Sequence, residues 1–175
     1  MQSVGMDTVT LILLSILPAL VIVAGLHDLT TMKIPNWISL ILIVAFFPAA
    51  FIAGLAPLSV GAHVGVAIAA LFIGAGMFAL NWIGGGDAKL MAAACLWLGV
   101  GGSGMFVLWT ALAGGMFCLA LIFARAYAPR YIGHAPGWVA HLMQPKGDIP
   151  YGVAIAIGAL LAFPTSPLVQ TFVGV

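Results

Sequence analysis

The sequence predicts an all-α, polytopic membrane protein with six transmembrane helices and a short interfacial helix. Of its 175 residues, 64% are hydrophobic and only 5% are charged, and the mean hydropathy is +1.25. Soluble domains carry roughly a quarter charged residues, so this chain could not cover a soluble globule with polar surface. The apolar residues also fall in long uncharged runs, as a membrane-spanning chain requires. Length predicts a single domain over residues 1–175.

Composition also excludes several classes of function. A net charge of +1 lacks the basic footprint of a nucleic-acid-binding protein, so no nucleic acid partner is expected. Cys95 and Cys118 lie in apolar runs and offer neither a disulfide framework nor paired metal ligands. His134 and His141 have no acidic or cysteine companions at metal-ligand spacing. We therefore expect no metal and no other cofactor.

The six spans follow from the uncharged runs, since a span needs roughly 20 apolar residues to cross roughly 30 Å of hydrocarbon. The run from Ile34 to Gly86 holds two spans, which a turn at Gly54–Ser59 separates. The cluster Gly99–Gly104 divides a second run, which as one helix would be roughly 50 Å long. Pro164 and Pro167 are expected to kink or fray the last span. The predicted spans are Thr8–Leu26, Trp37–Leu55, Val60–Trp82, Ala88–Val100, Met105–Ala124 and Tyr151–Val173.

The longest polar stretch, residues 125–148, is predicted to contain the interfacial helix. This helix would lie on the cytoplasmic leaflet between Pro136 and Pro145. Within it, one helical face carries Trp138, His141 and Leu142, and tryptophan suits the interface between membrane and water.

The basic residues predict how the chain is oriented in the bilayer. With six spans the loops alternate sides, and all five Lys and Arg residues then fall on one face. Because basic residues favour the cytoplasmic side, both termini are expected to be non-cytoplasmic. Merging the fourth and fifth spans would split the basic residues two against three, so their distribution favours six spans. The five are Lys33, Lys89, Arg125, Arg130 and Lys146.

The four acidic residues are all aspartates. Asp28, Asp87 and Asp148 are predicted on the cytoplasmic face, whereas Asp7 is predicted on the opposite face as an exposed terminal residue. Asp28 ends the first span and Asp87 begins the fourth, at helix ends that could pack side by side. Two carboxylates in close contact tend to share one proton, so the ionised member can deprotonate water while its partner protonates a carbonyl oxygen under attack.

Structural roles for the same two aspartates stay open at this point. Asp28 lies close to Lys33 and could form an ion pair, and Asp87 could cap the fourth span because Asp is a favoured N-cap residue. Capping does not explain the preceding Gly84-Gly85-Gly86, since three consecutive glycines are costly in a simple connection and allow backbones to approach closely.

Three motifs, in this order along the chain, resemble those of the prepilin peptidases, or type IV leader peptidases. Asp28 with the downstream Ile34-Pro35-Asn36 is similar to the family's first catalytic aspartate and its proline turn. Gly84-Gly85-Gly86-Asp87-Ala88-Lys89 resembles the glycine-x-glycine-aspartate motif with its following lysine. Ile149-Pro150-Tyr151-Gly152 resembles the C-terminal proline-aromatic-glycine element.

The resemblance implies a membrane-embedded aspartic endopeptidase with Asp28 and Asp87 as its catalytic dyad. Its partner would be a type IV pilin-like precursor, cut at the cytoplasmic face of the bacterial inner membrane just ahead of the precursor's hydrophobic helix. Larger members carry a cytosolic insertion with paired cysteines and also methylate the new N-terminus. Here the loop after the first span is short and no Cys-x-x-Cys occurs, so methyltransferase activity is not expected. The compact form is similar to peptidases of the tight-adherence (Flp-type) pilus systems and also to archaeal preflagellin peptidases.

The role of Lys89 and the function of the chain each have an alternative interpretation. Lys89 could orient Asp87, or it could be an interfacial lysine that sets membrane topology. A proton- or cation-coupled transporter is the rival function, because carboxylates in membrane proteins also bind ions. Against it, no predicted span carries a charge at mid-bilayer and inverted repeats are not apparent.

Overall fold

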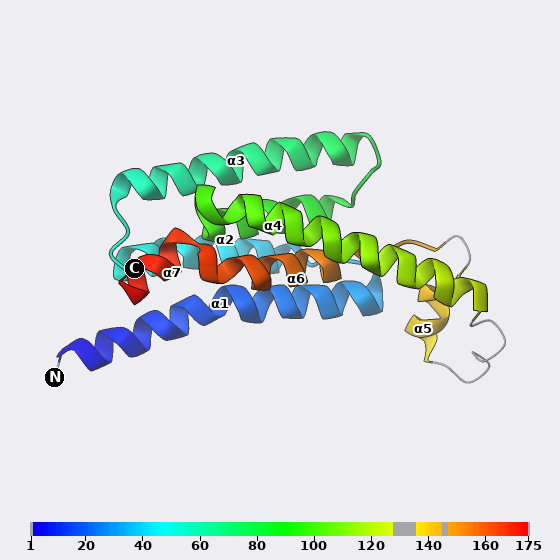
Figure 1. The fold of residues 1–175 in the computed structure, drawn as a ribbon, viewed down its shortest axis with the longest axis horizontal. Helices are drawn as coiled ribbons and strands as arrows, with labels where there is room; N and C mark the ends of the chain where they lie inside the picture. Colours follow the sequence, from blue (N-terminus) through cyan, green and yellow to red (C-terminus); the bar gives the residue numbers. More distant parts are fainter. Residues whose placement is uncertain (1, 128–135, 145–146, 175) are drawn as a thin grey trace.

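The computed structural model describes residues 2–127, 136–144 and 147–174, which contain helices and no strand (Figure 1). Arg130, His134, Lys146 and the side chain of Asp7 lie outside these described parts, so the predictions made for them stay predictions. The helices are α1 (Gln2–Thr31), α2 (Asn36–Ile52), α3 (Pro57–Ala79), α4 (Gly85–Tyr127), α5 (Gly137–Leu142), α6 (Tyr151–Ala162) and α7 (Pro167–Val173).

Helix α4 reverses its direction at Gly99. The backbone there has φ 61° and ψ −169°, a conformation outside the helical region. Tyr151 interacts with both Asp87 and Cys118, so these two residues of α4 lie close together. If α4 were straight, the roughly 30 residues between Asp87 and Cys118 would hold them about 45 Å apart. α4 therefore consists of two halves that fold back on each other, as Figure 1 shows. The break lies within the predicted cluster Gly99–Gly104.

The side chain of His63, from α3, packs into this reversal. Its Nδ1 lies 2.7 Å from the carbonyl oxygen of Leu96, one of the carbonyls that the break deprives of an intrahelical partner. The imidazole is only 2% exposed and stacks on the ring of Phe46, with centroids 5.4 Å apart. A Cβ built on Gly99 would lie 2.5 Å from the His63 ring, so the reversal and the histidine fit only with glycine at this position.

Small residues let the two halves of α4 approach different neighbours closely. The first half meets α3 where a Cβ on Gly74 would lie 3.0 Å from the Cβ of Ala88. The second half meets α6 at Gly158, where a Cβ would overlap the hydroxyl oxygen of Thr110. Such contacts are how transmembrane helices gain van der Waals packing without a hydrophobic driving force. They leave α6 packed between the second half of α4 and α1.

Three described helical segments are long and apolar enough to cross a membrane, namely Thr8–Thr31 of α1, α3 and α4. The pair formed by α6 and α7 passes the same test together but is bent by 40°. That bend confirms the kink predicted from Pro164 and Pro167, which flank Ser166 at the break. α2 has only 17 residues. The six predicted spans and the non-cytoplasmic termini therefore stay predictions.

The end of α1 and the short helix α5 can be compared with the predicted elements. α1 continues beyond Leu26 to Thr31, so Asp28 lies within the last turns of the helix. The short helix predicted between Pro136 and Pro145 is present as α5, where Leu142 is buried and Trp138 is exposed. α5 packs against α1; its position at a membrane surface stays a prediction.

Replacing Gly99 by Ala is expected to lower the free energy of unfolding by about 1–3 kcal/mol, because Gly99 has a backbone conformation that is essentially restricted to glycine. The added methyl group would also press on His63. Thermal unfolding of the purified protein in detergent measures the effect. Gly104→Ala is the matched control, since no described atom beyond the neighbouring turns of its own helix lies within 4 Å of a Cβ at that position. Equal stability of the two variants would contradict the account of the reversal.

Candidate active site

A polar cleft lies at the end of the bundle where α1 ends and where α4 and α6 begin. Its volume is about 320 Å³. Three of the four aspartates line it, Asp28, Asp87 and Asp148, together with Tyr151 from the third motif. The backbone segment that joins α3 to α4 supplies another wall, through Asn81, Trp82, Ile83 and Gly84.

Asp28 is held by the first turn of α6. Its Oδ2 accepts a hydrogen bond of 2.8 Å from the backbone N–H of Gly152, and its side chain is 6% exposed. The N-terminus of a helix favours negative charge, because its first backbone N–H groups have no partner within the helix and the positive end of the helix dipole lies there. A Cβ on Gly152 would lie 2.8 Å from the Cβ of Asp28, so only glycine permits this approach of α6 to α1.

Asp87 lies in the first turn of α4 and is 9% exposed. Its Oδ2 accepts a 3.0 Å hydrogen bond from the backbone N–H of Gly84, the bond that an acidic side chain in the first turn makes back to the N-cap residue. Its Oδ1 is buried and has no hydrogen-bond partner among the described residues. One oxygen of Asp87 therefore stabilises the start of the helix, while the other is free for another partner.

The fold brings the two aspartates together. They line the same cleft, and Asp28 acts electrostatically on Asp87. Among the described residues, Asp28 forms no ion pair with Lys33, and the backbone carbonyl oxygen of Lys33 lies 2.7 Å from Nδ1 of His27. Two buried carboxyl groups that share a cleft, each anchored by one backbone N–H, can divide the roles of acid and base between them.

The three consecutive glycines allow close packing around Asp87. A Cβ on Gly84 would lie 2.9 Å from Oδ2 of Asp87, and one on Gly86 would lie 3.0 Å from the Cβ of Ile34. None of the three has a positive φ. Their role is therefore to make room, and the contact between Gly86 and Ile34 joins the first two motifs directly.

Lys89 contacts the first motif and not Asp87. Its Nζ donates a 2.9 Å hydrogen bond to Oδ1 of Asn36. Asn36 is the first residue of α2, and Pro35 before it occupies the N-cap position. Lys89 thus ties the first half of α4 to the start of α2.

Arg125 anchors one wall of the cleft, a role that no sequence pattern around it predicts. Its Nε donates to the carbonyl oxygen of Leu142 and its Nη2 to that of Asp148, each at 2.9 Å. These bonds anchor the segment before α6, which lines the cleft through Asp148 and Ile149. Pro150 then occupies the N-cap position of α6.

Among the described residues, no group of three or more His, Cys, Asp or Glu side chains could hold a metal ion.

Comparison with known families gave a match for this chain. A sequence model of the type IV leader peptidase family matches residues 15–119, more than half of the chain. The match includes Asp28 and Asp87 and ends before Gly152. Comparisons with curated proteins and with solved structures gave no significant match.

Replacing Gly152 by Ala is expected to push α6 away from Asp28 and lower the free energy of unfolding by about 1–3 kcal/mol, the usual cost of overpacking. Thermal unfolding in detergent checks this expectation. Gly115→Ala adds the same methyl group where nothing lies within 4 Å, so its effect should stay within about 0.5 kcal/mol. A harmless Gly152→Ala would show that the close approach is not required.

Proposed function

The chain belongs to the type IV leader peptidase family, and on this basis we propose that it is a membrane-embedded aspartic endopeptidase that removes the leader of type IV pilin-like precursors. The observation that carries the proposal is the meeting of Asp28 and Asp87, which are far apart in the sequence, in one cleft. Gly152 of the third motif, which lies outside the matched range, donates the hydrogen bond that holds Asp28.

The proposed reaction uses the two carboxyl groups as acid and base. Carboxylates this close cannot both ionise cheaply, so the pair shares one proton and titrates as a unit. The ionised member takes a proton from water as the water oxygen attacks the scissile carbonyl carbon, and the protonated member donates to the carbonyl oxygen. The carbon–nitrogen bond then breaks as the leaving amine takes the proton that the base removed from water, and the former carbonyl oxygen returns its proton to the other carboxyl group. Oδ1 of Asp87 is buried and has no hydrogen-bond partner in the described part of the chain, which supports a role in binding the water or the scissile peptide.

We also propose that the cleft faces the cytoplasm of the cell that makes the pili, at its inner membrane, and that the chain crosses the membrane six times. The reversal at Gly99 supports counting α4 as two crossings. Three basic residues lie at the same end as the cleft, because Lys33 follows α1, Lys89 bonds to Asn36 and Arg125 holds the Asp148 carbonyl. Basic residues at that end support the cytoplasmic assignment.

The proposed substrate is an Flp-type pilin precursor, cleaved without methylation of the new N-terminus. Only residues 32–35 separate α1 from α2, which leaves no room for the cysteine-bearing insertion at this point. The rival function, a proton- or cation-coupled transporter, gains no support here, because both aspartates lie at one end of the bundle beside the cleft.

Asp28→Asn and Asp87→Asn should each reduce precursor cleavage by more than about 100-fold, because each variant removes one member of the acid–base pair. Purified protein is incubated with candidate precursors in detergent, and the mass of the precursor N-terminus reports cleavage. Asp7→Asn provides the same chemical change about 30 Å along α1 from Asp28 and should cleave normally. Full processing by either dyad variant would refute the aspartyl mechanism.

A further inference from the structure

A second hollow lies between α2 and α3. Its volume is about 690 Å³. Its floor is the first half of α4, through Lys89, Ala92, Ala93 and Leu96. We call this hollow the α2–α3 groove. Apart from Lys89 and Asn36 at one end, and Ser39, its lining side chains are apolar.

We propose that the α2–α3 groove holds the apolar helix of the precursor while the leader is cut. This inference rests on the proposed function and adds to it the docking surface of the substrate. It follows from the helical spacing of the lining residues, the residues of the floor and the position of the Lys89 end of the groove near the cleft.

The lining has the pattern of a seat for one more helix. On α4 the lining residues recur at positions 89, 92, 93 and 96, and on α3 at 64, 67, 68 and 71, which is the spacing of a single helical face. α2 adds a third stripe through Leu40, Ile43 and Phe47. Seven residues of helix extend about 10 Å, and two turns of a helix 10 Å wide occupy about 800 Å³. The groove therefore matches a short length of one apolar helix.

The floor of the groove also suits close helix contact. Ala92 and Ala93, which are only 7% and 1% exposed, contribute nothing larger than methyl groups at the base of the groove between α2 and α3. Small residues at such positions let a transmembrane helix approach closely enough to gain van der Waals packing. The walls are well exposed, with 61% of Leu40 and 49% of Ile68 accessible, so a helix in the groove would cover them.

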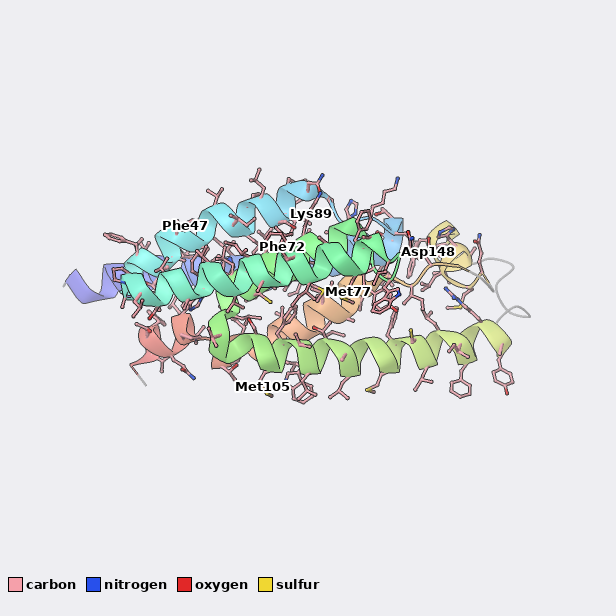
Figure 2. All side chains as sticks on the ribbon, turned by 90° about the horizontal axis from the view of Figure 1, so that it is seen from above. Phe47, Phe72, Met77, Lys89, Met105 and Asp148 are labelled. Carbon is pink, nitrogen blue, oxygen red and sulfur yellow. The ribbon has the colours of Figure 1, made fainter. Side chains whose placement is uncertain are left out.

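The Lys89 end of the groove lies toward the cleft. Lys89 and Phe47 lie toward opposite ends of the groove, and Asp148 of the cleft lies beyond the Lys89 end (Figure 2). Asp87 is only two residues before Lys89 on α4, a rise of about 3 Å. A helix in the groove would leave the apolar lining at Lys89 and Asn36, and a few extended residues at about 3.4 Å each would carry the preceding chain to Asp87. This order of apolar helix and scissile bond is the one that the proposed substrate requires.

Cross-linking tests the occupant directly. A photo-reactive benzoylphenylalanine replaces Ile68 in the full chain carrying Asp28→Asn, which keeps the precursor intact. Light should join residue 68 to the apolar helix of a pilin-like precursor in lipid nanodiscs. The same probe at Ile73, an exposed position of α3 outside the groove, should give no precursor adduct. Adducts with lipid alone at position 68, or equal precursor adducts at both positions, would overturn the proposal.

Kinetics supply an independent readout. Ile68→Trp narrows the groove and should raise the KM for the full precursor about tenfold with kcat retained, the signature of lost substrate binding. Ile73→Trp should leave both constants at their wild-type values, and equal KM values for the two variants would reject the groove. If the wild-type protein cleaves no precursor, the proposed function fails, while cross-linking still decides whether the groove receives the helix.

Discussion

Each candidate catalytic carboxyl group is anchored by a backbone N–H at the start of a helix, and the site depends on these two bonds. Gly84 holds Asp87 at the start of α4, and Gly152 holds Asp28 at the start of α6. Both donors are glycines, and a Cβ at either position would clash with the aspartate that the glycine binds. The Gly84 bond is local to the first turn of α4, whereas the Gly152 bond forms only because α6 packs closely against α1. This close packing explains why small residues recur along the contact between α1 and α6.

The reversal of α4 is what allows three distant motifs to share one cleft. The first half of α4 carries Asp87, and the second half returns to the same end, where Cys118 interacts with Tyr151 and Arg125 holds the chain before α6. His63 and Gly99 secure the turn at the far end. Residues far from the cleft thus determine its geometry.

The features that the sequence predicted have local causes. Glycine and proline act on the backbone next to them, so the break in the glycine cluster and the bend near Pro164 could be placed in advance. The two aspartates could be singled out because few charged residues occur in the chain. Contacts between residues far apart in the sequence could not be predicted from a local pattern. The partners of Lys89, His63 and Arg125 are backbone or amide oxygens brought near by packing, and nothing in the local pattern specifies them. Hydropathy likewise marked where a span could end, at Leu26, but not where the helix itself ends, at Thr31.

The anchoring bonds also give each carboxyl group two unlike oxygens. A hydrogen bond from N–H stabilises negative charge on the oxygen that accepts it, and Oδ2 accepts in both aspartates. A proton is therefore better accommodated on the geminal Oδ1, which in Asp87 has no partner among the described residues. In the proposed reaction, proton exchange with water would therefore take place at Oδ1, because a backbone N–H already occupies Oδ2 of each aspartate.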